Sequence, residues 1–279
     1  MEKEELKKMM VKAIDSLTEK ERSVVVLYYY EEMTLKEISL TLEVSESRVS
    51  QLHTKALNKM KKLLIDSRVR KVEYEYLSRY FDVIKLPLSN DVYEEISGHS
   101  DIFYCKLQNK IICAPNAPIR EKEFIVGKNL VGRTYPYDVL YNACQIGDFI
   151  IGSKYTDSMI SPNITVKQGY TKCSICVTSK NSCITSDRGI DKILKGNGIN
   201  SAFIEENNIK LLKKDGKYSN MKGFIGGACF IFDNKFVLFG DIENLESKEK
   251  IIEHLKKYEL ELVDFKGLEV NDYGGAIIY

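Results

Sequence analysis

Polar and basic side chains recur at helical spacing between residues 46 and 63, and they are of the types that contact nucleic acid. At about 100° per residue they lie on the side of an expected helix opposite its apolar stripe. Such side chains hydrogen-bond to base edges or pair with phosphates. The pattern predicts a DNA-binding face, although a solvated amphipathic helix also directs charges outward. The predicted contact residues are Ser47, Arg48, Gln51, Thr54, Lys55, Asn58, Lys59 and Lys62.

A second group of residues is suited to nucleophilic catalysis. In the GHSD stretch, His99 could act as a base and Asp101 could orient it, with a cysteine as nucleophile if the fold brings them together. The alternative is that His99 lies in a polar loop and that the cysteines fill strand faces, where free cysteine is commonly buried. No catalytic residue is therefore assigned. The candidate thiols are Cys173, Cys176 and Cys229.

Two further acids, Asp187 and Asp241, each follow the second strand of an expected strand pair. They could line a channel and bind a cation such as a guanidinium, or they could cap helices, as Asp commonly does. Cys173 and Cys176 form a CxxC, but a structural zinc needs four ligands and the sequence has no second CxxC or nearby HxxxH. The paired glycines open strands, unlike phosphate-binding loops. No metal and no cofactor are predicted.

Helix-start signals place the DNA-binding face in a helix-turn-helix. Thr34 and Glu37 form a capping box, and Ser45 is a good N-cap for the helix that carries the polar face. Thr18 and Glu21 form another capping box. Four helices are thus expected to fill residues 2 to about 65. The first of them is predicted from the apolar residues Leu6, Met9, Met10, Ala13, Ile14 and Leu17.

The stretch LTEKERSVVVLYYYEEMTLKEISLTLEVSESRVSQLHTKAL resembles region 4 of the sigma-70 type of bacterial RNA polymerase sigma factors, and most of all the flagellar type. The resemblance covers about the first quarter of the chain. It implies that residues 35–62 dock in the major groove of the promoter −35 element, with Arg48, Gln51 and Lys55 on the reading face. It also implies that the preceding helices contact the flap of the polymerase core. No stretch resembles sigma regions 2 and 3.

After Phe81 the pattern changes to alternation, which predicts strands. Four strand-turn-strand units follow, and the last two each precede a helix, over residues 189–196 and 247–258, and a further strand. The final GGAIIY could pair with FDVIKLP as a fifth unit. The expected body is α/β, built from strand-strand-helix-strand pseudo-repeats. The four turns are expected near Asn109 and Lys110, at Gly147 and Asp148, at Lys180 and Asn181, and near Asn234.

The stretches KQGYTKCSICV, ITSDRGI, GFIGGACFIF and YPYDVLYNA resemble an uncharacterised subfamily of the guanidine-modifying-enzyme, or pentein, fold. This resemblance implies a five-fold propeller over residues 81–279. Members with known activity act on guanidines through a Cys nucleophile near the C-terminus, with a His and acids around a central channel. The matching place here is DYGGAIIY, which has no cysteine. The resemblance therefore implies a body that binds a small guanidino ligand or is structural, with an enzyme acting on guanidino compounds as the alternative.

Composition fits two folded domains in a chain of 279 residues, 44% of them hydrophobic and 29% charged. We expect a helix-turn-helix domain over residues 1–66, a connector of helical character over 67–80 and the α/β propeller over 81–279. The sequence shows no signal-peptide pattern and no apolar run of about 18 residues, which predicts no membrane span. Seven cysteines without framework spacing favour a cytoplasmic, reducing setting.

The sequence as a whole predicts a DNA-binding protein of transcription initiation or its regulation. The net charge is only +1, yet the segment from Arg48 to Lys71 holds many bases and the single acid Asp66. The expected partners are promoter DNA and the RNA polymerase core, with a possible small guanidino ligand for the body.

Overall fold

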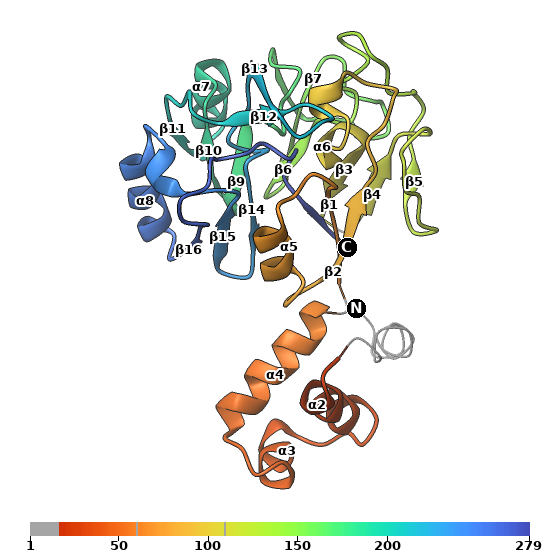
Figure 1. Ribbon diagram of the computed structural model, residues 1–279, viewed down its shortest axis with the longest axis vertical. Helices are drawn as coiled ribbons and strands as arrows, with labels where there is room; N and C mark the ends of the chain where they lie inside the picture. The colour runs from red at the N-terminus through yellow and green to blue at the C-terminus, as the bar shows by residue number, and fades with distance from the viewer. Residues whose placement is uncertain (1–16, 60, 109) are drawn as a thin grey trace. The chain divides into compact units, whose positions relative to one another are not determined.

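The computed structural model describes residues 17–59, 61–108 and 110–279 (Figure 1). The first predicted helix, apart from Leu17, lies outside the described residues. The chain divides into two compact units. One comprises Met1–Leu63, Lys71–Ile84 and Ile278–Tyr279, and the other comprises Leu64–Arg70 and Lys85–Ile277. We call the helical part of the first unit, up to residue 59, the head, and the second unit the body.

The head contains α2 (Glu19–Tyr29), α3 (Leu35–Thr41) and α4 (Glu46–Lys59). Both predicted capping boxes are present, at the starts of α2 and α3. Between α3 and α4 the chain turns at Glu43, whose φ is 53°. The apolar stripes of the three helices meet in a small core, as their spacing predicts. Its fully or nearly fully buried members are Leu17, Val24, Val25, Tyr29, Ile38, Val49, Leu52 and Ala56.

The predicted last helix is too long. In the structure this helix, α4, ends at Lys59, and β1 (Lys62–Asp66) follows. The three consecutive apolar residues 63–65 explain the difference: all three are buried in the strand, whereas a helix would turn at least one of them away from its apolar face. After β1 come α5 (Lys71–Leu77) and β2 (Asp82–Leu86), so the expected helical character of the connector is confirmed over residues 71–77.

The body repeats one arrangement of three strands four times. In each case two antiparallel strands form a hairpin, and a third strand pairs in parallel with the second. All four predicted hairpins are confirmed. The sheets are β3 (Tyr104–Leu107), β4 (Lys110–Cys113) and β5 (Ile125–Val126); β6 (Cys144–Ile146), β7 (Phe149–Ser153) and β8 (Ile164–Val166); β9 (Ile175–Ser179), β10 (Ser182–Thr185) and β11 (Asn200–Phe203); β14 (Cys229–Phe232), β15 (Lys235–Leu238) and β16 (Glu261–Val263).

Both predicted helices of the body are confirmed, as α7 (Arg188–Gly196) and α8 (Lys248–Lys257), each between the second and third strands of its sheet. In the sheets β3-β4-β5 and β6-β7-β8, loops occupy the corresponding positions. Figure 1 shows α7 in green and α8 in blue beside their strands. The pseudo-repeat is therefore regular in its strands and variable in its connection.

Three details of the body differ from the predictions. The residues before Tyr104 form the short α6 (Ser100–Phe103) and not a strand. The final strand, β17 (Ile277–Ile278), neighbours β1 in the order β17-β1-β2, so GGAIIY does not pair directly with FDVIKLP. A hairpin of β12 (Lys210–Leu212) and β13 (Tyr218–Lys222) has no counterpart in the predictions. The described strands form separate open sheets with linear orders and no closed barrel, and the predicted five-fold propeller is not confirmed.

Burial is concentrated between neighbouring sheets of the body. One cluster of buried side chains joins α7 to strands of two sheets, and another joins α8 to β14 and β15. None of the helices in the described ranges is long and apolar enough to cross a membrane.

Candidate nucleic-acid interface and buried polar cluster

Helix α4 presents a polar face whose two central side chains hold each other in place. Ser45 accepts a hydrogen bond from the backbone N–H of Arg48 at 3.1 Å, as expected for an N-cap. The Arg48 guanidinium donates from Nη1 to Oε1 of Gln51 at 3.1 Å. Both side chains are exposed, as are three other predicted contacts, Ser47, Thr54 and Lys55. This arrangement leaves most donors of Arg48 and the amide N–H₂ of Gln51 directed to solvent.

Lys59 does not lie on the exposed polar face of α4, although its spacing predicted it among the DNA contacts. Its ammonium donates to Oε2 of Glu21 at 2.8 Å, and its side chain is only 15% exposed. Lys55 approaches the other carboxylate oxygen of Glu21 at 3.3 Å but keeps 46% of its side-chain surface. Lys55 can still turn toward a phosphate, whereas the ion pair between Lys59 and Glu21 links α4 to α2.

The Glu21 carboxylate is the centre of this contact. Burial opposes its ionisation, but the Lys59 ammonium and the hydrogen bonds from Thr18 outweigh burial and lower the pKa of Glu21 to about 2. The same carboxylate also completes the capping box, because its Oε2 accepts the Thr18 N–H at 2.9 Å. Glu21 thus stabilises the start of α2 and the end of α4 together.

Lys62, another predicted contact residue, lies beyond α4. Lys62 lies in β1, where its backbone exchanges two hydrogen bonds with Tyr279, at 2.7 and 2.9 Å. Its ammonium lies 5.6 Å from the centre of the Tyr279 ring. Lys62 is therefore not part of α4. Asn58 belongs to α4, but its side chain lies outside the described part of the chain.

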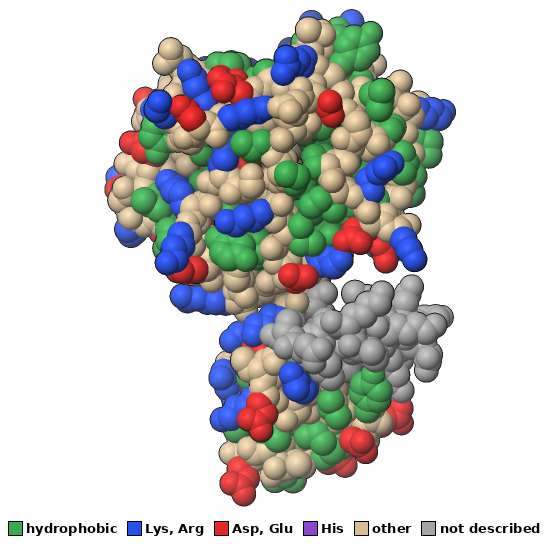
Figure 2. Space-filling model, turned by 45° about the vertical axis from the view of Figure 1, so that its right-hand side comes forward, with side chains coloured by type: hydrophobic (Ala, Val, Ile, Leu, Met, Phe, Trp, Pro, Cys, Tyr) green, Lys and Arg blue, Asp and Glu red, His purple; other side chains and the backbone are tan. Residues whose placement is uncertain are grey.

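His53 is a structural residue of the head that the spacing did not single out. Its Nε2 lies 3.1 Å from the Tyr29 hydroxyl, and its ring stacks on the Tyr29 ring at 5.5 Å. Burial lowers the pKa of His53, which favours the neutral ring. In the view of Figure 2, Lys and Arg side chains gather on one flank of the head, while Asp and Glu lie mainly along its other margins.

In the body, the fold brings two of the candidate catalytic residues into direct contact. The Cys173 thiol donates to Oδ2 of Asp101 at 3.0 Å, and both side chains are buried. Asn142 ties the pair together, since its amide donates to Cys173 Sγ at 3.1 Å and to the Asp101 carbonyl at 3.0 Å. The residue patterns of the sequence did not identify Asn142.

His99 faces Asp272 and is not oriented by Asp101 as expected. Its Nδ1 lies 3.7 Å from Oδ1 of Asp272. The Asp272 carboxylate accepts N–H bonds from Phe224 at 2.8 Å and Gly274 at 2.9 Å. Neither ring nitrogen of His99, nor Oδ1 of Asp101, has a partner at hydrogen-bonding geometry among the described residues. Three unsatisfied buried polar atoms in one cluster are unusual in a native fold.

The glycines of DYGG explain how this cluster packs. Gly274 has φ +70°, and a Cβ there would lie 2.4 Å from the Cβ of His99. Only glycine combines that backbone conformation with such a close approach. The paired glycines therefore serve backbone packing, as their position before a strand suggested. The polar side chain that this stretch contributes to the cluster is that of Asp272. Only the position of Asp272 in DYGG could have pointed to this role in the sequence.

Burial controls the protonation of the cluster. It raises the pKa of Asp101 to about 6, against the lowering effect of the Lys172 charge. Burial and the Asp101 charge raise the pKa of Asp272 to about 7. Burial also holds the pKa of His99 well below its usual range, and it raises the pKa of Cys173 far above that of a free thiol. A thiol that stays protonated and donates to a carboxylate is a poor nucleophile.

The other candidate residues have structural partners. Cys176 and Cys229 place their sulfurs 2.8 Å apart in the core. Asp187 caps α7, accepting the Ile190 N–H at 2.8 Å. Asp241 caps the short 3₁₀ helix Ile242–Asn244 and accepts the Gly267 N–H at 2.7 Å. Within the described residues no group of three or more His, Cys, Asp or Glu side chains could hold a metal ion.

Replacing Asp272 with asparagine is expected to change how stability depends on pH. Because the folded pKa of Asp272 is raised, ionising it costs stability as pH rises from about 4 to about 7. The neutral Asp272→Asn variant avoids that cost, so its stability relative to wild type should increase by about 3 kcal/mol over this range. Urea unfolding of both proteins at pH 4, 5.5 and 7 measures the difference in stability. A constant difference across these pH values would contradict a raised pKa of Asp272 in the folded protein.

Comparison with known proteins separates the head from the body. Residues 13–62 match the family described as Sigma-70, region 4. RNA polymerase sigma factor FliA of Yersinia enterocolitica is 50% identical over 56 residues, 20% of this chain and 24% of that protein. RNA polymerase sigma-D factor of Bacillus subtilis is 52% identical over 62 residues, 22% of this chain and 24% of that protein. The chain thus spans about a quarter of the length of these curated relatives.

The second match covers the body and most of the chain, over residues 64–277. It begins within β1 and ends at β17, so it includes every residue of the buried cluster. The chain therefore belongs to the Family of unknown function DUF6873.

Proposed function

We propose that this protein binds promoter DNA and recognises a −35 element through α4. The observation that carries the proposal is the Arg48–Gln51 pair, exposed on a capped helix whose other side is packed into the head. Arginine bonds bidentately to guanine and glutamine to adenine in the major groove. A recognition helix after a tight turn is the element that enters this groove. The sigma region 4 match over residues 13–62 supports the same role.

Within this proposal the residues of α4 have different tasks. Arg48 and Gln51 read base edges, and Ser47 and Thr54 contact bases or backbone. Lys55 pairs with phosphate, since it is the α4 lysine that keeps much of its surface exposed. Lys59 has a structural role through Glu21. The RNA polymerase core is a second partner, by analogy with the sigma factors that the head resembles, and its flap is the proposed contact.

For the body we propose a pentein-like arrangement that binds a small polar ligand without turning it over. The repeated order of two antiparallel strands and one parallel strand supports the fold, together with the fifth set of three strands, β17-β1-β2. The unsatisfied atoms of His99 and Asp101 favour a ligand, because a bound polar group would satisfy them. The protonated state of Cys173 argues against turnover. Asp187 and Asp241 are engaged in caps, so they are not proposed as a guanidinium site.

The alternative, an enzyme on guanidino compounds, predicts activity that depends on the buried thiol. The full chain would then release ammonia or citrulline-type products from arginine or agmatine, and Cys173→Ala would abolish the release. The proposal expects no product from either protein.

Binding of the protein to a −35 DNA duplex should fall steeply with salt. A few Lys and Arg contacts to phosphate release a few counterions, so affinity should drop about 10–100-fold between 50 and 200 mM salt. Fluorescence anisotropy with the full chain measures this, using a scrambled duplex of the same length for comparison. Affinity that is the same at both salt concentrations, or equal for both duplexes at each, would count against promoter recognition by the head.

A further inference from the structure

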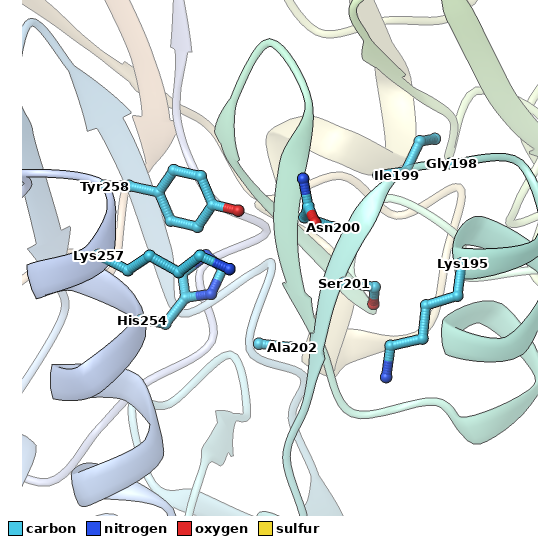
Figure 3. A pocket seen from close by; sticks show the side chains of 9 residues that line it. All are labelled: Lys195, Gly198, Ile199, Asn200, Ser201, Ala202, His254, Lys257 and Tyr258. Atoms are coloured by element: carbon cyan, nitrogen blue, oxygen red, sulfur yellow. The ribbon is translucent and has the colours of Figure 1, made fainter.

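A pocket of about 320 Å³ lies in the body between β11 and the last turns of α7 and α8. In Figure 3, His254 and Tyr258 project from α8 toward β11, and Lys195 comes from α7. A second hollow, of about 710 Å³, shares Ala202, His254 and Lys257 with the first. Together they border the whole length of β11, and we call them the β11 groove.

One edge of β11 is open to this groove. β11 is the terminal strand of the order β11-β10-β9. On the paired edge, the Asn200 N–H donates to the Asn181 carbonyl at 3.0 Å and the Ile204 N–H to the Thr185 carbonyl at 2.9 Å. Successive residues of a strand direct their backbone N–H and C=O groups to opposite edges. The N–H and C=O groups of Ser201 and Phe203 therefore point away from β10. Among the described strands none pairs with that edge, which leaves a template for another strand.

The groove is positively charged. Its lining includes a single acid, Glu253, and the four lysines Lys195, Lys250, Lys256 and Lys257. Lys195 is partly neutralised by Asp191, at 3.0 Å. Lysines at helix C-termini commonly serve the helix dipole, which accounts for three of the four. Lys250 has no such explanation, because it lies in the first turn of α8, where the dipole disfavours a cation.

The groove also contains a polar group without a partner. The Tyr258 hydroxyl is enclosed, and no described residue hydrogen-bonds to it. The centre of its ring lies 4.7 Å from the centre of the His254 ring.

We infer that the β11 groove binds an extended, acidic segment of a partner protein, which adds a strand to the open edge of β11. Main-chain hydrogen bonds to Ser201 and Phe203 supply affinity in this mode of recognition, and side chains supply specificity. Alternate acidic side chains of the added strand would face the lysines of α8. A strand of four residues is about 13 Å long, so the segment is short. Nucleic acid is the competing polyanion, but it lacks the alternating amide groups that the edge would pair with.

The test uses the full chain and a labelled eight-residue peptide of alternating Glu and Val, followed by fluorescence anisotropy. Three matched probes accompany it: a Lys/Val peptide, a Glu/Val peptide N-methylated at alternate residues, and a single-stranded DNA octamer. N-methylation removes amide donors from one edge of the peptide and leaves its charge intact, so it separates strand addition from simple attraction. The N-methylated peptide is made in two forms, one for each edge. We expect the Glu/Val peptide to bind and the Lys/Val peptide and the DNA octamer not to bind. N-methylation on the pairing edge should weaken binding of the Glu/Val peptide at least tenfold.

Two variants locate the site. Lys250→Glu combined with Lys257→Glu should weaken the acidic peptide at least tenfold, while Lys128→Glu, an exposed change elsewhere on the body, should leave it unchanged. Ser201→Pro removes one outward N–H and should also weaken binding, with circular dichroism as the check on folding. Failure of the Glu/Val peptide to bind, equal binding of both N-methylated forms and the parent, or tighter binding of the DNA octamer would each overturn the inference.

Discussion

Replacing Arg48 with alanine should lower affinity for a cognate −35 duplex about 5–150-fold, which corresponds to roughly 1–3 kcal/mol. The same change should affect a scrambled duplex much less, because phosphate contacts remain. Arg48 and Gln51 are exposed on α4 and bonded to each other, so the free protein already holds them in a shared orientation. Preorganisation of this kind reduces the ordering cost on binding.

Gln51→Ala should have an effect of the same kind, and the double variant should lose less than the sum of the two single losses. Residues in one hydrogen-bonded network are not additive, and the double-mutant cycle measures their coupling. Lys55→Ala provides the contrast, since losing a phosphate contact weakens all sequences alike. Lys62→Ala is the matched control and should change little, because Lys62 lies in β1 beyond the recognition helix. Equal losses on cognate and scrambled DNA for Arg48→Ala would remove α4 as the reading helix.

Local signals in the sequence predicted most of the elements that position these residues. A capping box needs only residues three apart, so Thr18 with Glu21 and Thr34 with Glu37 could be identified directly. The hairpins were equally accessible, because alternation and turn residues are local. The end of α4 could not be predicted from local signals. Residues 63–65 fit helical spacing poorly, and they pair in a sheet with β17, which lies far along the chain.

The candidate sites show the same limit more sharply. Spacing placed Lys59 among the DNA contacts, but the tertiary contact with Glu21 buries most of its side chain. The approach of Cys173 to Asp101 joins two residues 72 positions apart in sequence, and it could be stated only as a possibility. Asp272 gave no signal of its own, because a lone Asp beside glycines is common in turns.

Replacing Glu21 with glutamine is expected to destabilise the head by about 2–4 kcal/mol, the largest loss of stability among the changes considered. Removing one partner of a buried ion pair leaves the other charge uncompensated, here the largely buried Lys59 ammonium. Glutamine at this position still completes a capping box, so the loss reports the charge and not the cap. Glu37→Gln is the matched control, because Glu37 has the same capping role in α3 but is exposed and bonds to Thr34 of its own box. It should cost much less.

The pH dependence of this difference gives a second, independent reading of the same contact. The folded pKa of Glu21, about 2, lies below the ordinary value of 4.5, so its ionised form contributes stability above that value and loses it as pH falls toward 2. The gap between wild type and Glu21→Gln should therefore be widest at neutral pH and close as pH approaches 2. Urea unfolding followed by circular dichroism at 222 nm, at several pH values and with Glu37→Gln alongside, measures it. If the gap keeps its size down to pH 2, or if the two variants lose stability equally, then the Glu21–Lys59 pair does not hold α2 and α4 together as the geometry indicates.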